Sequence, residues 1–301
     1  MDGLGGLLIV DKDSGLTSHD VVARCRKLLR TKKVGHAGTL DPMATGVLVL
    51  GVERATKLLG LLTLTTKAYT ATIRLGQATS TDDAEGEVLS TTPALHLTDD
   101  EIATQTTKLT GDIDQVPATV SAIKVNGERA YARHRAGEEV QLAARPVTVS
   151  RFDILTRRDV PDGEFVDLDV VVECTSGTYV RALARDLGAA LGVGGHLTAL
   201  RRTRVGPFTL EHARTLGELA EAAESDAALL SLDMDAAVRT AFPHREIDES
   251  QVDDLRNGRW LAPIGLPGVY AALAPDGRAI ALLQESGKRA ASVMVVRPSN
   301  L

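Results

Sequence analysis

The chain has 301 residues, of which 44% are hydrophobic and 25% are charged, a composition typical of globular proteins. Its longest apolar runs are about seven residues, and a membrane-spanning helix needs ~20, so no membrane span is expected. No signal peptide is expected either, because the N-terminus lacks a basic segment followed by an apolar stretch. The two cysteines, Cys25 and Cys174, argue against a disulfide framework or a zinc site and fit a reducing cytoplasm.

The net charge of −6 argues against unspecific coating of nucleic acid, but the charges are unevenly distributed. Residues 1–75 hold eleven Lys/Arg and six Asp/Glu, whereas residues 209–256 hold four Lys/Arg and twelve Asp/Glu. A basic N-terminal third in an acidic chain predicts one cationic face.

The first predicted elements are a buried strand at Leu7–Val10 and a helix at about His19–Leu29, capped by Thr17 or Ser18. The polar side of this helix and its end carry six cations in ten residues with no acid among them. This run is either a solvated helix face or an edge that contacts phosphates. Its members are Arg24, Arg26, Lys27, Arg30, Lys32 and Lys33.

The stretch Val34–Gly46 is predicted to be a loop, because it holds three glycines and a proline before an apolar, strand-like run. Asp41 is its only acid, and Pro42 disfavours helical backbone at Asp41. A glycine-punctuated loop with one carboxylate next to a buried strand can hold a nucleophile or a base. The alternative is an ordinary Asp-Pro turn.

The middle of the chain predicts a short helix at Glu53–Leu61, a strand at Lys67–Leu75 with alternating apolar residues, and a polar loop at 76–86. Thr98 and Glu101 form a capping-box pattern that opens a helix to about Leu109. A segment punctuated by proline and glycine follows at 115–127 and leads into a basic stretch.

Two alternating segments, Arg145–Leu155 and Phe165–Cys174, predict neighbouring antiparallel strands. A helix to about Leu191 and an arginine-rich strand near 194–204 follow. The acidic segment 216–237 is predicted to be helical. After a boundary at Pro243, short strand-like runs at 269–273, 280–283 and 293–296 indicate a small β-rich module.

Residues 35–46, Gly-His-Ala-Gly-Thr-Leu-Asp-Pro-Met-Ala-Thr-Gly, resemble the signature of the TruB family of bacterial tRNA pseudouridine synthases. The resemblance covers about residues 7–210 in four ordered segments. It implies an α+β pseudouridine-synthase fold: a mixed, mainly antiparallel sheet flanked by helices, with a central active-site cleft. It also implies a catalytic domain at 1–238, with an RNA-gripping insertion at about 112–140, and a PUA-like domain at 242–301.

The resemblance further implies the residues of the active site. Asp41 is expected to be the catalytic residue, Tyr69 to stack on the target base, and Arg181 to pair with Asp41. His36 is expected to stabilise the position vacated by the flipped base, although by itself it reads as a structural loop histidine. The remaining substrate-binding candidates are Tyr179, Leu200, Asp83 and Lys12; Lys12 has the alternative role of supporting the catalytic loop.

The implied partner is tRNA, bound through its T-arm and T-loop by a monomer. The residues expected to contact the RNA backbone are Arg30, Lys32, Lys33, Lys124, Arg201 and Arg202. Formation of pseudouridine is redox-neutral, so no cofactor and no metal are expected, in line with the lack of a dinucleotide or phosphate-loop motif.

The implied reaction breaks the N1–C1′ bond of a uridine and joins C5 to C1′. It needs a carboxylate that forms an adduct or stabilises positive charge, with C1′ and C6 both open to attack. A guanidinium suits the task of keeping a desolvated carboxylate ionised. The alternatives are a glycosidase that uses Asp41, and an RNA-binding or RNA-folding protein. A glycosidase normally needs a second nearby acid, and Asp41 is the only acid between Asp20 and Glu53.

Overall fold

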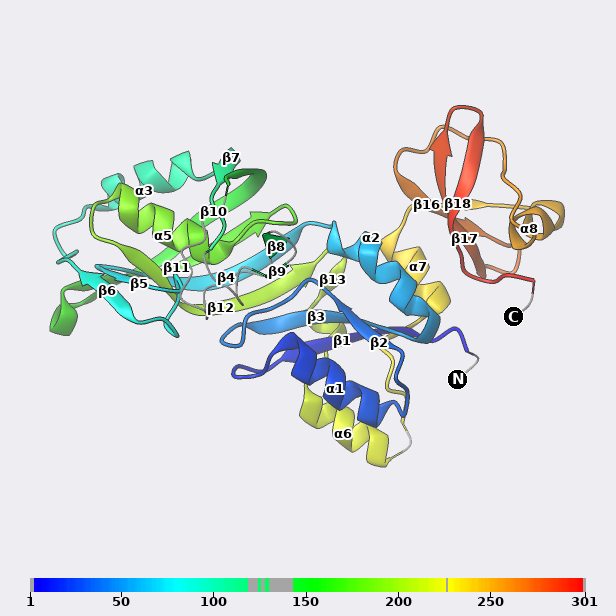
Figure 1. Ribbon diagram of the computed structural model, residues 1–301, viewed down its shortest axis with the longest axis horizontal. Coiled ribbons are helices and arrows are strands. Elements are labelled where there is room, and N and C mark those ends of the chain that lie inside the picture. Colours follow the sequence, from blue (N-terminus) through cyan, green and yellow to red (C-terminus); the bar gives the residue numbers. More distant parts are fainter. Residues whose placement is uncertain (1–2, 119–123, 126–127, 130–142, 226, 300–301) are drawn as a thin grey trace. The chain divides into compact units, whose positions relative to one another are not determined.

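The computed structural model describes residues 3–118, 124–125, 128–129, 143–225 and 227–299 (Figure 1). The chain forms two compact units. The first comprises Met1–Asp41, Val47–Thr63 and Gly206–Leu301, and the second comprises Pro42–Gly46 and Leu64–Val205. The predicted domains at 1–238 and 242–301 follow a different division and stay a prediction.

The first unit contains a small sheet in which β1 (Gly6–Lys12) lies between β14 (Leu232–Asp233) and β3 (Thr45–Val52). Strand β2 (Val34–Ala37) pairs antiparallel with β3, with His36 opposite Leu50. Strands β1 and β3 are almost entirely buried. The helices of this part are α1 (Ser18–Leu28), η1 (Glu53–Leu58), α2 (Leu59–Thr63), η3 (Leu210–His212), α6 (Leu216–Glu224) and α7 (Met234–Ala241).

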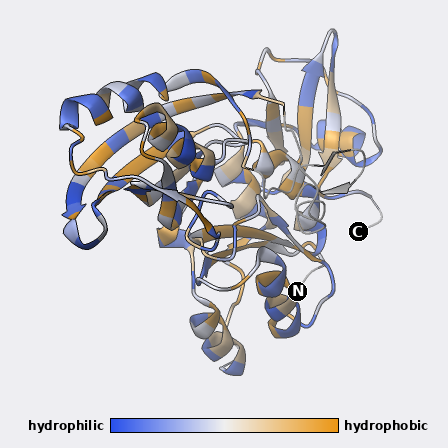
Figure 2. Ribbon diagram, turned by 60° about the vertical axis from the view of Figure 1, so that its left-hand side comes forward, coloured by the Kyte–Doolittle hydropathy of each residue, from blue (hydrophilic) through white to orange (hydrophobic). Residues whose placement is uncertain are grey.

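Helix α1 begins where the sequence predicts. Thr17 is the N-cap, and its hydroxyl accepts the Asp20 N–H at 3.1 Å, while the Asp20 carboxylate accepts the Thr17 N–H at 2.9 Å. Val21, Val22 and Cys25 are buried, as expected for one apolar stripe. Figure 2 shows that the helices contain both hydrophilic and hydrophobic residues, which appear as alternating bands along each ribbon.

Two predictions for this unit were wrong. The first residues of the expected loop form strand β2, because β3 offers a pairing edge that the local sequence does not reveal. The expected helix at 216–237 is instead two helices, α6 and α7, with β14 between them. Strand β14 pairs with Gly6 and Leu7, more than 200 positions earlier in the chain, so its extended backbone depends on a distant partner.

The second unit is built on a sheet with the order β12-β4-β11-β10-β7. All of these pairings are antiparallel, and the start of β3 joins the edge in parallel, with Thr45 opposite Arg201 on β12. This confirms the expected mixed, mainly antiparallel sheet. The strands are β4 (Lys67–Leu75), β7 (Gly111–Gln115), β10 (Arg145–Val160), β11 (Phe165–Cys174) and β12 (Gly195–Val205).

Helices α3 (Asp99–Lys108) and α5 (Val180–Ala190) belong to this unit. Helix α5 lies so close to β12 that a Cβ on Gly188 would be 2.2 Å from the backbone of Gly195, so the approach requires glycine at this position. The expected polar loop at 76–86 contains strand β5 (Gln77–Thr79), which pairs with β6 (Val88–Thr91). The shorter elements are β8 (Lys124–Val125), β9 (Glu128–Arg129) and η2 (Pro161–Gly163).

The C-terminal part of the first unit has a sheet of its own, with the order β15-β16-β17-β18. Its core includes Tyr270, Ile280 and Leu283, and Val252 and Leu255 of α8 (Glu249–Arg256) pack against them. The predicted strand at 269–273 is confirmed as β16 (Val269–Leu273). The other strands are β13 (Phe208–Thr209), which precedes this part, and β15 (His244–Glu246), β17 (Ala279–Ser286) and β18 (Arg289–Val295).

Among the described residues, none of the helices combines the length and the apolar character that crossing a membrane requires. Both cysteines are buried as free thiols.

Candidate active site

The backbone next to Asp41 is held by the start of helix α1. The hydroxyl of Ser18 donates to the carbonyl of Leu40 at 3.1 Å and accepts the Leu40 N–H at 2.9 Å. Ser18 is only 1% exposed, so water competes little for these two bonds. The N–H and the carbonyl of Leu40, the residue before Asp41, are therefore both held in place. Asp41 itself is half-buried.

Two other predicted residues lie in the same unit. Lys12 ends strand β1 and is fully buried, and its ammonium group donates to the Asp13 carbonyl at 2.9 Å. This burial favours the alternative role, support of the loop, over contact with a substrate. His36 lies on β2, and its ring meets that of His19 edge-on at 5.4 Å between centroids.

The chain enters the second unit directly after Asp41. Pro42–Gly46 belongs to that unit, and Gly46, with a φ of +99°, lies opposite Arg202 on β12. A Cβ at Gly46 would be 2.1 Å from the Arg202 carbonyl oxygen, so only glycine fits here. This explains in physical terms why the signature ends on a glycine.

Tyr69 and Leu200 lie on one face of the sheet. Tyr69 is opposite Arg202, and Leu200 is opposite Ala71, in the pairing of β4 with β12. Directly opposed residues share a face, and diagonal neighbours lie about 7–8 Å apart, so Tyr69 and Leu200 are within reach of one small molecule. Both residues are 8% exposed, which leaves each a small accessible surface.

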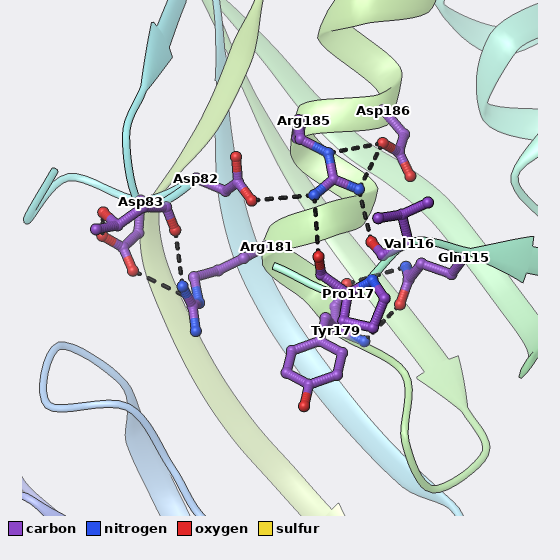
Figure 3. Close-up of polar contacts among 10 residues, drawn as sticks. Asp82, Asp83, Gln115, Val116, Pro117, Tyr179, Arg181, Arg185 and Asp186 are labelled. Atoms are coloured by element: carbon purple, nitrogen blue, oxygen red, sulfur yellow. Dashed lines mark hydrogen bonds and ion pairs between the residues drawn. The ribbon is translucent and has the colours of Figure 1, made fainter. Parts of the chain in front are cut away.

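Arg181 is in the first turn of α5 and is buried, with 3% of the residue exposed. Its Nη1 donates to the Thr81 carbonyl at 2.7 Å, and its Nε lies 3.5 Å from the Asp83 carboxylate (Figure 3). The Asp83 carboxylate also accepts the Glu85 N–H at 3.1 Å. Asp83, 3% exposed, is therefore a partner of Arg181. Its predicted contact with substrate stays a prediction.

The structure pairs Arg181 with Asp83, and Tyr179 is the N-cap residue of α5, two positions before Arg181. Asp41 belongs to the first unit and Arg181 to the second. Their pairing stays a prediction.

The residues expected to contact RNA have different surroundings. Arg30, Lys32 and Lys33 are exposed, but Lys33 forms an ion pair with Glu53 at 3.2 Å, so the fold supplies an acid that the local run lacks. Arg201 is half-buried and donates to the Thr45 hydroxyl at 3.3 Å. Arg202 is only 1% exposed, which disfavours a contact with RNA, and this contact stays a prediction. Lys124 is in β8, and its side chain lies outside the described part of the structure.

The sequence analysis did not select Lys67 as a candidate residue. Lys67 is a buried cation two residues before Tyr69 on the same face of β4. It is 6% exposed, and its ammonium group donates to the Thr65 carbonyl at 2.7 Å. Burial, and after it the positive charge of Arg202, lowers the pKa of Lys67 to about 8. The sequence could have indicated this burial, because Lys67 occupies the same side of a predicted alternating strand as the apolar residues.

This shift predicts a pH-dependent stability. Between about pH 8 and pH 10.5 the unfolded chain keeps the Lys67 proton while the folded chain loses it, so stability rises with pH. The free energy of unfolding of the wild type, relative to Lys67→Met, is expected to increase by about 2 kcal/mol from pH 7 to pH 9.5. Urea unfolding of both proteins at each pH measures this difference. A difference that stays constant with pH would contradict the assignment.

The described fold is similar to those of solved structures. A chain in the crystal structure of a Cbf5–Nop10–Gar1 complex matches with a TM-score of 0.75 and 27% identity, covering 99% of this chain and 87% of that one. A chain in the structure of an H/ACA RNP bound to a substrate RNA containing 2′-deoxyuridine matches with a TM-score of 0.73 and 26% identity, covering 98% and 86%.

Family models match most of the sequence. Residues 26–180 match the N-terminal domain of the TruB family pseudouridylate synthases. Residues 181–239 match the tRNA pseudouridylate synthase B C-terminal domain, and residues 242–297 match the tRNA pseudouridine synthase II C-terminal model. These matches and the fold define the class of the protein: it is a pseudouridine synthase, and thus an isomerase.

Full-length relatives identify the branch of this class. The tRNA pseudouridine synthase B of Nocardia farcinica is 77% identical over 301 residues, covering 100% of this chain and 96% of that protein. The protein of the same name from Rhodococcus jostii is 71% identical over 297 residues, covering 98% and 95%. The chain belongs to the TruB family.

Proposed function

We propose that this protein converts the uridine at T-loop position 55 of tRNA to pseudouridine, with Asp41 as the catalytic carboxylate. The names of its full-length relatives support tRNA as the substrate. The observation that carries the proposal is the buried Arg181, held by Asp83 and Thr81 in the unit that also presents Tyr69 and Leu200 on one sheet face. A buried, oriented guanidinium suits a carboxylate partner, and an aromatic ring and an apolar side chain on one sheet face suit a flat base.

Access to the base requires base flipping. A stacked loop uridine must be extruded at a cost of a few kcal/mol, and stacking on the Tyr69 ring returns ~1–3 kcal/mol. Leu200 closes the apolar side of the pocket, and Tyr179 lines it from the start of α5. His36 stabilises the position that the base leaves in the RNA.

The chemistry is an isomerisation in which the atoms balance within the uridine. Asp41 attacks the nucleotide or stabilises the positive charge at C1′ while the N1–C1′ bond breaks. The freed base turns, C5 bonds to C1′, and the proton on C5 leaves through Tyr69 as acceptor or relay while N1 gains one. Arg181 keeps the Asp41 carboxylate ionised in a site from which water is excluded.

Binding of the T-arm is proposed to use cations of both units. Arg30, Lys32 and Lys33 follow helix α1 and are exposed, and Arg201 and Lys124 are in the second unit. Such contacts fix the orientation of the RNA and make binding dependent on salt. The segment 242–301 is proposed to be a PUA-like domain, and the protein is proposed to act as a monomer.

The test is to incubate an unmodified tRNA transcript with the protein and to map pseudouridine at single-nucleotide resolution. We expect complete conversion at position 55, and none in a transcript that carries cytidine there. Pseudouridine at another position would overturn the T-loop assignment. Release of free uracil would favour a glycosidase, and tRNA binding without conversion would favour a binding or folding role.

A further inference from the structure

Helix α5 carries two arginines one turn apart, and a loop presents two consecutive aspartates to them. Arg181 pairs with Asp83, and Nη1 of Arg185 lies 3.2 Å from the Asp82 carboxylate (Figure 3). Residues four apart share a helix face, so the two pairs form along one side of α5. Asp82 is 7% exposed and Asp83 is 3% exposed, so both acids are buried against the helix.

Arg185 also binds residues 116–117, which follow strand β7. Its Nη2 donates to the Val116 carbonyl at 2.7 Å, and its Nη1 lies 3.5 Å from the Pro117 carbonyl oxygen. Its Nε donates to Asp186 at 2.9 Å. One planar guanidinium thus connects three segments, which the point charge of a lysine cannot do.

Gln115, at the end of β7, makes a second connection to the same helix. Its side-chain oxygen accepts the Tyr179 N–H at 2.8 Å, and its side-chain nitrogen donates to the Tyr179 carbonyl at 3.1 Å. Tyr179 is the N-cap residue of α5, and tyrosine lacks the short oxygen-bearing side chain that usually caps a helix. Gln115, which is 2% exposed, instead accepts the N–H of Tyr179 itself, the bond that the N3 side chain makes in a capping box, and it does so from another strand.

The two connections lie on either side of Arg181 along the helix. Residues 115–117 hold Tyr179 before it and Arg185 after it, and Arg185 ties the helix to the loop that carries Asp83. Asp82 adopts a φ of +62°, a left-handed conformation that aspartate tolerates better than most residues other than glycine. Burial raises the pKa of Asp82, and the charge of Arg185 opposes that rise. Buried charges with specific partners and shifted pKa values gather at functional sites.

We propose that Arg185 is a positioning residue that fixes Arg181 and Asp83 in the geometry needed for isomerisation, with Gln115 as its counterpart at Tyr179. The inference rests on the proposed function, in which Arg181 acts on Asp41. Two other roles for Arg185 are structural support alone and contact with an RNA phosphate, since its side chain is 27% exposed.

The test compares Arg185→Met with a matched control, Arg157→Met. The Arg157 side chain is 22% exposed, pairs with Asp99 and Asp159 and donates to a backbone carbonyl, but it lies on β10. We expect Arg185→Met to lower the single-turnover rate of pseudouridine formation at saturating enzyme 10- to 100-fold, with a change in tRNA Kd below threefold. Arg157→Met is expected to stay within twofold in both quantities.

Two further variants probe the mechanism. Arg185→Lys keeps the charge opposite Asp82 but not the bridge to Val116, so its rate should fall between those of the wild type and Arg185→Met. Asp82→Asn should lower the rate less in the Arg185→Met background than in the wild type, because the pair acts as one unit. Arg185→Lys also keeps the proposal testable if Arg185→Met does not fold.

Amide hydrogen exchange gives a readout that does not depend on activity. Exchange at residues 179–181 is expected to accelerate at least tenfold in Arg185→Met and to stay unchanged in Arg157→Met. Unchanged exchange, or a lower melting temperature with an unchanged rate, would overturn the positioning role. A weaker salt dependence of tRNA binding would instead assign Arg185 to a phosphate contact. An inactive wild type would refute the proposed function itself, and hydrogen exchange would still show whether Arg185 holds residues 179–181 in place.

Discussion

Replacing Asp41 with asparagine is expected to lower pseudouridine formation by roughly four orders of magnitude or more, while tRNA binding changes less than about threefold. The amide keeps the shape of the carboxylate but carries no charge and is a poor nucleophile. The loop should keep its shape, because Ser18 holds the backbone of Leu40 through bonds that do not involve the Asp41 side chain. Single-turnover conversion of a tRNA transcript and a binding titration measure the two quantities separately.

The control for this experiment is Asp100→Asn, which removes an exposed acid from the first turn of α3 and should leave both quantities unchanged. Equal losses of turnover and binding in Asp41→Asn would contradict the chemical role of Asp41. Slow release of uracil by the wild type, lost in the variant, would instead identify Asp41 as the acid of a glycosidase.

Helices and strands of this protein can be predicted from its sequence where the interactions that stabilise them lie within the element itself. The alternation in Lys67–Leu75 and Phe165–Cys174 predicts strands with the observed bounds. The Thr98–Glu101 capping box forms as predicted, with the Glu101 carboxylate accepting the Thr98 N–H at 2.8 Å. In each case the determining contacts are within the element or come from burial of one face.

The misses have a shared physical cause, which is dependence on distant partners. Strands β2 and β14 are short and pair with strands that the local pattern does not specify. The acid that pairs with Lys33 is Glu53, twenty positions away on η1. A cation-rich run therefore overstates the free charge that the folded surface presents.

In the candidate site, too, some residues can be identified from the sequence, and others only from the fold. The resemblance to a family singles out Arg181 and Tyr179, and the structure adds that Arg181 is buried against Asp83. The sequence does not show the connecting roles of Gln115 and Arg185, because the partners in other segments lie 64 to 103 positions away. The i, i+4 spacing of the arginines and the adjacent aspartates are visible, but only the fold shows that they face each other.

The second large effect is expected at Arg181. Arg181→Met should destabilise the protein by about 3–5 kcal/mol, because it leaves the Asp83 carboxylate buried without its guanidinium. It should also lower the single-turnover rate by roughly a thousandfold or more, with a much smaller change in tRNA affinity. Chemical unfolding, single-turnover kinetics and binding are measured on the same preparation.

The double variant Arg181→Met/Asp83→Asn separates the two tasks of the guanidinium. Removing the unpaired charge should recover most of the lost stability, since replacing both members of a buried ion pair is far less costly than removing one. If Arg181 also holds the Asp41 carboxylate ionised, turnover stays low in the double variant although the fold is restored. Recovery of turnover together with stability would mean that Arg181 serves only Asp83, and the proposed pairing with Asp41 would be wrong.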